Sequence, residues 1–129
     1  MERILPALVW IFGAVCIVIA LVHIAVGPSS IPGSIPVNAT LDSEDRFYAS
    51  LFLGFGAALI WCSRALGERA GVFYALLAVF FIGGVARFVS YLQVGLPHPL
   101  FQFLWAVELV LPIVLYLWHR KQYGIAGTR

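Results

Sequence analysis

Four long apolar blocks, separated by short polar segments, make up most of the chain. They predict helices over residues 4–27, 46–64, 72–94 and 100–117. A helix of about 20 apolar residues crosses a 30 Å hydrocarbon core, and each block is long enough or nearly so. The pattern therefore predicts an all-α integral membrane protein, an antiparallel four-helix bundle that forms a single domain over residues 1–129.

The first block also has to be weighed as a secretory signal peptide, because Glu2 and Arg3 precede it. Its apolar stretch exceeds the roughly 7–15 residues of a signal-peptide hydrophobic region. The Gly-Pro-Ser-Ser sequence at 27–30 is also a poor cleavage site. We therefore expect a membrane helix over 4–27.

The segment between the first two blocks predicts a loop and then a helix start. Prolines and glycines break any periodicity over 28–41, which indicates an extended loop. The acidic run 42–45 follows, and carboxylates stabilise the first turn of a helix. Within the second helix, Ser50, Gly54 and Ala58 recur every four residues, which predicts a face that packs closely on a neighbour.

Composition and charge narrow the class further. The chain is 62% hydrophobic and 11% charged, with mean hydropathy +0.97, whereas a soluble domain is about 45–50% apolar and about 25% charged. These values exclude a soluble or a disordered chain. The net charge is only +2, without a dense basic cluster, so we expect no nucleic-acid partner. Neither the two cysteines nor the three histidines have the spacing of a metal site, and none is predicted.

The basic residues predict the orientation. In a four-span chain, six of the eight fall on the side of the termini and the second loop: Arg3, Arg64, Arg69, Arg120, Lys121 and Arg129. Loops rich in Lys and Arg stay in the cytoplasm. We therefore expect a multi-pass protein of the bacterial inner membrane with both termini cytoplasmic and with loops 28–45 and 95–99 facing outward.

Polar residues gather in the outward half of the predicted helices. At 1.5 Å per residue, Arg87 lies about 10 Å, Glu108 about 12 Å and His23 about 6 Å below the outer helix ends. The inward half carries no comparable set. The candidate ligand-binding residues are Arg87, Glu108, His23, Arg46, Asp45 and Ser90. A charge within a span costs several kcal/mol or more unless it is paired or faces water. Two interpretations stay open: an Arg87–Glu108 bridge that only joins two helices, or a pocket that binds a ligand.

Several strings resemble one family of bacterial membrane proteins. They are DSEDRFYA at 42–49, LGFG at 53–56, GGVARFVS at 83–90, GLP at 95–97 and EL at 108–109. With these strings the chain resembles the family grouped as domain of unknown function 4345, over most of its length. The resemblance implies four membrane helices and no established activity. The layout is more distantly similar to the DoxX-like four-span proteins, at the level of fold alone.

The residues favour a binding or accessory protein. We expect an outward polar pocket that holds a lipid, a quinone-like molecule or another small amphiphile, or a protein that docks on a larger membrane complex. One alternative is an intramembrane enzyme that uses Glu108 or His23 for acid–base chemistry. Another is a proton-coupled transporter acting as a homodimer. The sequence assigns no catalytic residue, cofactor or metal.

Overall fold

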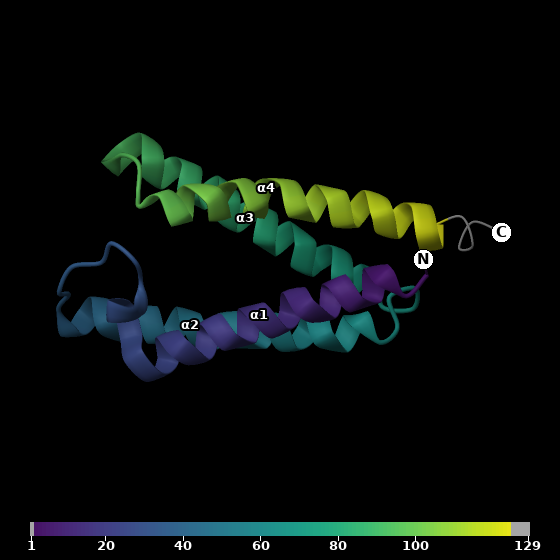
Figure 1. Cartoon of the computed structure of the whole chain (residues 1–129), viewed down its shortest axis with the longest axis horizontal. Coiled ribbons are helices and arrows are strands. Elements are labelled where there is room, and N and C mark those ends of the chain that lie inside the picture. The colour runs from purple at the N-terminus through teal and green to yellow at the C-terminus, as the bar shows by residue number, and fades with distance from the viewer. Residues whose placement is uncertain (1, 125–129) are drawn as a thin grey trace. The chain divides into compact units, whose positions relative to one another are not determined.

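The computed structural model describes residues 2–124, and every regular element among them is helical (Figure 1). The order is α1 (Ile4–Val26), η1 (Gly27–Ser30), α2 (Ala39–Ser63), α3 (Ala70–Val94), α4 (Pro99–His119) and the π-helical turn η2 (Arg120–Gly124). Four helices are long and apolar enough to cross a membrane. This confirms the all-α prediction with four membrane-length helices. Arg129, counted above among the basic residues, lies outside the described residues.

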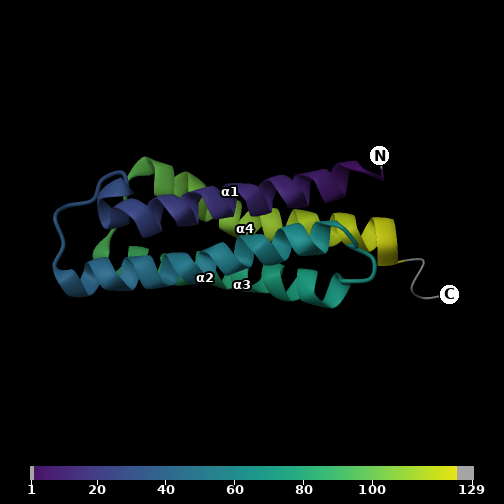
Figure 2. The same cartoon turned by 90° about the horizontal axis from the view of Figure 1, so that it is seen from below.

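The chain divides into two compact units, and each is described by itself. One unit, Ala7–Arg64, holds most of α1 with α2. The other combines Met1–Pro6 with Ala65–Arg129 and holds α3 and α4. In each unit two consecutive helices run antiparallel and are joined at one end, as Figures 1 and 2 show.

In the first unit the helices approach most closely at two glycines. A Cβ on Gly13 would lie 2.6 Å from the carbonyl oxygen of Gly56, and a Cβ on Gly56 would lie 2.6 Å from that of Gly13. The predicted face is not the one that packs on α1, because nothing lies within 4 Å of a Cβ at Gly54. Residues two apart point about 200° apart on a helix, so Gly54 faces away when Gly56 faces α1.

Helix α2 begins seven residues before the predicted start at Arg46. Asn38 has an extended backbone, and its side chain accepts a hydrogen bond from Leu41 N at 2.9 Å. This is N-terminal capping, and it starts the helix at Ala39. The acidic run 42–45 consequently lies within the first two turns of α2, and the predicted loop 28–41 is shortened by η1 and by these turns.

In the second unit α3 and α4 meet along matching seams. The turn between them uses Gly95, at φ +109, and Pro99 in the first turn of α4. A Cβ on Gly84 would lie 2.8 Å from Leu109 Cδ2, so this glycine lets α4 approach α3. Trp105 Nε1 donates to the Gly84 carbonyl at 2.9 Å across the same contact. Gly83 has open space beside it.

A buried histidine anchors the other end of this hairpin. The His119 side chain is 1% exposed and packs against the rings of Phe73, Tyr74 and Tyr123. A carbonyl only accepts, so the His119 Nε2 donates to the Leu66 carbonyl at 2.8 Å. In the neutral ring, Nδ1 accepts from the Tyr74 hydroxyl at 2.7 Å. The sequence pattern gave no indication of this buried His119–Tyr74 pair.

Candidate functional site

Arg87 on α3 and Glu108 on α4 form an ion pair. Arg87 Nε donates to Glu108 Oε2 at 2.7 Å, a short charge-assisted hydrogen bond. The Glu108 side chain is 13% exposed and that of Arg87 is 37% exposed. The matched depth predicted from sequence therefore corresponds to a direct contact. The contact leaves the cationic partner the more accessible of the two.

Phe101, on the first turn of α4, covers part of the Arg87 guanidinium. The central carbon Cζ lies 5.5 Å from the centroid of the Phe101 ring, within the range of cation–π attraction. Phe101 precedes Glu108 by two helical turns, so it lies nearer the turn that joins α3 and α4. The guanidinium therefore extends from the level of Glu108 toward that turn.

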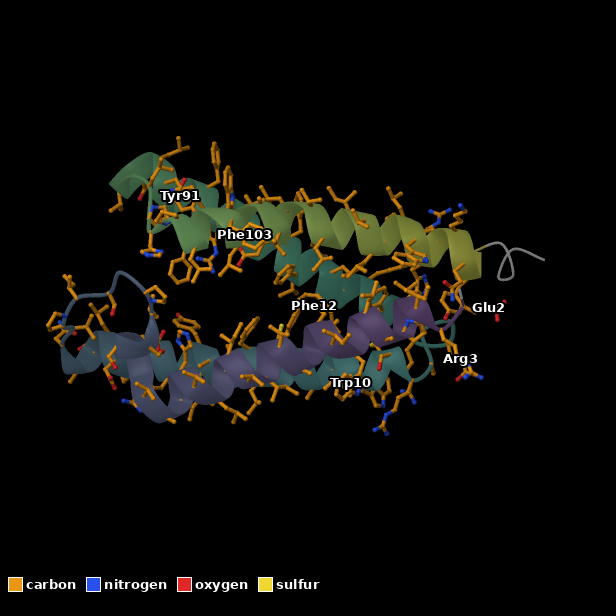
Figure 3. The ribbon with its side chains drawn as sticks, in the orientation of Figure 1. Glu2, Arg3, Trp10, Phe12, Tyr91 and Phe103 are labelled. Carbon is orange, nitrogen blue, oxygen red and sulfur yellow. The ribbon has the colours of Figure 1, made fainter. Side chains whose placement is uncertain are left out.

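An aromatic wall lies beside the ion pair. Trp105 stacks on Phe88 with ring centroids 6.0 Å apart and meets Tyr91 edge to face at 5.2 Å. The Tyr91 hydroxyl donates to the Phe101 carbonyl at 3.1 Å, which fixes α3 to the first turn of α4. Figure 3 shows Tyr91 and Phe103 at this end of the hairpin. No sequence spacing marks these three aromatic residues, because they come together beside Arg87 only when the hairpin forms.

Ser90 follows Arg87 on α3 by three residues and is exposed. Gln102 is drawn into the turn, because its Nε2 donates to the Pro97 carbonyl at 3.0 Å. Ser90 thus adds a hydroxyl to the exposed surface of α3 one turn above Arg87.

His23 on α1 pairs with Asp45 on α2. Its Nδ1 lies 3.2 Å from Oδ1 and 3.1 Å from Oδ2 of Asp45. A carboxylate only accepts, so Nδ1 carries the proton and donates, which leaves the lone pair of the neutral ring on Nε2. The two side chains are 23% and 21% exposed. No sequence spacing places a partner for His23, because the two residues are 22 positions apart and meet only when the hairpin forms.

Arg46 joins the end of α1 to α2. Its Nη1 donates to the Ile24 carbonyl at 2.7 Å, and its Nε donates to Asp42 Oδ2 at 2.8 Å. The last carbonyls of a helix lack partners within the helix, so Arg46 satisfies one of them. Gly27, at φ +79, lies against this pair, and a Cβ there would be 2.8 Å from Arg46 Nη2. The contacts of Arg46 are those of a helix cap.

The predicted ligand-binding residues thus belong to two clusters in separate units. Arg87, Glu108 and Ser90 lie on the α3–α4 hairpin, whereas His23, Asp45 and Arg46 lie on the α1–α2 hairpin. A hollow of about 500 Å³ opens beside the second cluster, and Asp42 is its one charged lining residue. Both Asp42 oxygens already accept from Arg46, so the hollow offers no uncommitted charge. Within residues 2–124 no three His, Cys, Asp or Glu side chains come together as a metal site would require.

The chain belongs to the family described as domain of unknown function DUF4345, whose model matches residues 4–119. No curated protein and no solved structure matches the chain.

Proposed function

We propose that this member of the DUF4345 family is a binding protein of the bacterial inner membrane that holds an amphiphile at Arg87 and Glu108. The observation that carries the proposal is the exposure of Arg87. Its side chain is 37% exposed although Nε is bonded to Glu108 at 2.7 Å. A guanidinium has five N–H donors, and this bond uses one of them.

In a bridge that only joined two helices, we would expect more of the Arg87 N–H groups to be hydrogen-bonded within the protein. In a low-dielectric surrounding, an ion pair repays its desolvation only if further hydrogen bonds satisfy the remaining protons. The described contacts of the Arg87 guanidinium are one hydrogen bond and the face of Phe101. The four N–H groups on its terminal nitrogens therefore favour a further acceptor, supplied by a bound molecule.

The proposed orientation puts this site in the outward half of the membrane. Four basic residues lie away from the 95–98 turn. Two are in the 64–69 connection, Arg64 and Arg69, and two follow the far end of α4, Arg120 and Lys121. Under the positive-inside rule these residues are cytoplasmic, and the turn beside Arg87 faces outward. The amphiphile then enters from the outer leaflet.

The experiment compares wild type with Arg87→Leu, Glu108→Leu and the double variant, each extracted in a mild detergent. Native mass spectrometry reports bound small molecules and stoichiometry together, and a thermal melt reports stability. Each single change leaves one charge without its partner and lowers the melting temperature, while the double change restores it because no unpaired charge remains. We expect the double variant to be stable and to lack the bound molecule. A stable double variant with full occupancy would contradict the proposal and leave a structural bridge.

The His23–Asp45 contact favours a second candidate, acid–base chemistry on the α1–α2 hairpin. A carboxylate that accepts from Nδ1 fixes the tautomer and leaves Nε2 basic, as in a general base. Under this alternative the α1–α2 hairpin binds a substrate of its own, and His23→Gln abolishes conversion of that substrate. A substrate recovered chemically identical from wild type and His23→Gln would argue against it.

A further inference from the structure

We infer that the molecule bound at Arg87 carries a phosphate group, and that the two terminal nitrogens of Arg87 hold it as the head group of a membrane phospholipid. This inference rests on the proposed function and specifies the chemistry of the same site. It follows from which guanidinium nitrogen Glu108 occupies, from the residues that the guanidinium contacts and from the surface around it.

Glu108 bonds to Nε and leaves available the two terminal nitrogens Nη1 and Nη2, which form the fork of the guanidinium. Glu108 accepts from Nε, at the base of the group. The remaining donors are the four N–H groups on Nη1 and Nη2, and one from each nitrogen points outward in parallel at the far edge. That edge matches two oxygens of one phosphate, which is the bidentate geometry that Arg provides and Lys does not.

The contacts of the guanidinium place this fork between Glu108 and a residue close to the turn. The Arg87 Cα lies seven residues before the end of α3, about 10 Å below the turn, whereas Phe101 lies about 3 Å below the start of α4. The guanidinium is bonded to Glu108 through Nε and faces the Phe101 ring, so it lies between a deeper residue and one close to the turn. A long basic side chain near the end of a span can place its charge at the membrane interface.

The surroundings suit acyl chains better than a soluble anion. Phe88, beside Arg87 in sequence, is 46% exposed and stacks on Trp105, while the Phe101 ring faces the guanidinium. These rings give an apolar surface next to the charged group. A site for free phosphate would need more polar groups around the anion, whereas a lipid needs one polar anchor and apolar neighbours.

Glu108 orients Arg87, and its charge also opposes a bound anion. The variant Glu108→Gln keeps an oxygen that accepts from Nε and removes the negative charge. We expect it to bind the phosphate more tightly than wild type, because like charges repel strongly where water is scarce. Arg87→Lys keeps the positive charge and loses the fork, so it should bind less tightly by at least about tenfold.

The test uses the full chain, stripped of lipid in detergent, with two probes of identical acyl chains: phosphatidylglycerol and diacylglycerol, which lacks phosphate. Occupancy is measured by native mass spectrometry for wild type, Arg87→Lys, Glu108→Gln and the control Lys121→Gln, whose changed residue lies in η2 at the other end of the hairpin. Melting curves identify any variant that fails to fold. We expect wild type and Lys121→Gln to prefer phosphatidylglycerol at least about tenfold. The preference should fall in Arg87→Lys and rise in Glu108→Gln.

The outcomes separate this inference from the proposed function. Equal binding of the two probes would overturn the phosphate assignment while the amphiphile site stands. Absence of binding by either probe, in a protein that also carries no bound molecule when purified, would overturn both. Loss of phosphatidylglycerol on addition of millimolar inorganic phosphate would identify soluble phosphate as the ligand and overturn the lipid assignment. If Arg87→Lys does not fold, a Glu108→Gln variant without increased occupancy overturns the inference by itself.

Discussion

Gly27 combines a left-handed backbone with a crowded position at the end of α1. Its φ is +79, and a Cβ would lie 2.8 Å from both Arg46 Nη2 and Asp42 Oδ1. Gly27→Ala should therefore lower the free energy of unfolding by about 1–3 kcal/mol, from backbone strain and from displacement of the ion pair.

The matched control is Gly71→Ala in the first turn of α3, where nothing lies within 4 Å of the added Cβ. Alanine is favoured over glycine in a helix by up to about 1 kcal/mol, so this variant should be as stable as wild type or slightly more stable. Chemical or thermal unfolding in detergent measures both changes. Equal stabilities of the two variants would mean that Gly27 is not constrained as described.

The hydroxyl of Tyr74 has a defined partner in the buried His119 ring. Tyr74→Phe removes the donor to Nδ1 and leaves that nitrogen buried without a hydrogen bond. The expected loss of stability is about 1–3 kcal/mol. Tyr116→Phe is the control, because it removes an exposed hydrogen bond from Arg120 at 3.2 Å and should cost less than about 0.5 kcal/mol. A larger loss in Tyr116→Phe than in Tyr74→Phe would contradict the assigned network.

The residue pairs divide into those that spacing can predict and those that it cannot. Arg46 and Asp42 are four apart on one helix, a spacing at which side chains are neighbours. Arg87 and Glu108 could be matched because a short turn sets their levels. His23 and Asp45 could not be matched, because their contact depends on how α1 and α2 rotate about their own axes. His119 was missed because its partners, the Leu66 carbonyl and the Tyr74 hydroxyl, are 53 and 45 positions away in the sequence.

At the scale of the helix, the glycine pair Gly13 and Gly56 sets the approach of α1 to α2. Gly56→Ala would place a Cβ 2.6 Å from the Gly13 carbonyl oxygen, a backbone atom that no side-chain rotation can move away. We expect a clear drop in melting temperature for Gly56→Ala and none for Gly54→Ala, which has open space. The two variants change the same residue type two positions apart in one helix. A reversed order of melting temperatures would restore the face predicted from Ser50, Gly54 and Ala58.

The seam between α3 and α4 could have been read from the sequence at this scale. Along α4 the residues that contact α3 or are buried recur at alternating steps of four and three: Phe101, Trp105, Glu108, Pro112, Leu115 and His119. Such spacing is typical of helices packed side by side. Arg87 and Gly84 occupy the matching seam of α3. The length of each apolar block predicted that a helix is present but not how the helix is rotated about its axis. Which side of α4 faces α3 follows only from this spacing.

At the scale of the whole molecule, the proposed topology makes a prediction for the 31–38 loop. Ser34 is exposed, while the native Cys16 and Cys62 are 2% and 0% exposed. A Ser34→Cys variant should react with a membrane-impermeant maleimide on intact cells, and Glu68→Cys, in the 64–69 connection, should react only after permeabilisation. The opposite pattern of labelling would invert the orientation and move the Arg87 site to the cytoplasmic half.

The central claim is that Arg87 contacts a lipid phosphate, and solid-state NMR can measure that contact directly. Protein labelled with ¹⁵N at arginine is reconstituted in phosphatidylglycerol bilayers, and the dipolar coupling between guanidinium nitrogen and ³¹P is compared for wild type and Arg87→Lys. A phosphate hydrogen-bonded to Nη1 and Nη2 places phosphorus about 4 Å from these nitrogens. We predict a short-range ³¹P coupling in wild type that is lost from the Arg87→Lys spectrum. Identical couplings in the two proteins would contradict the claim.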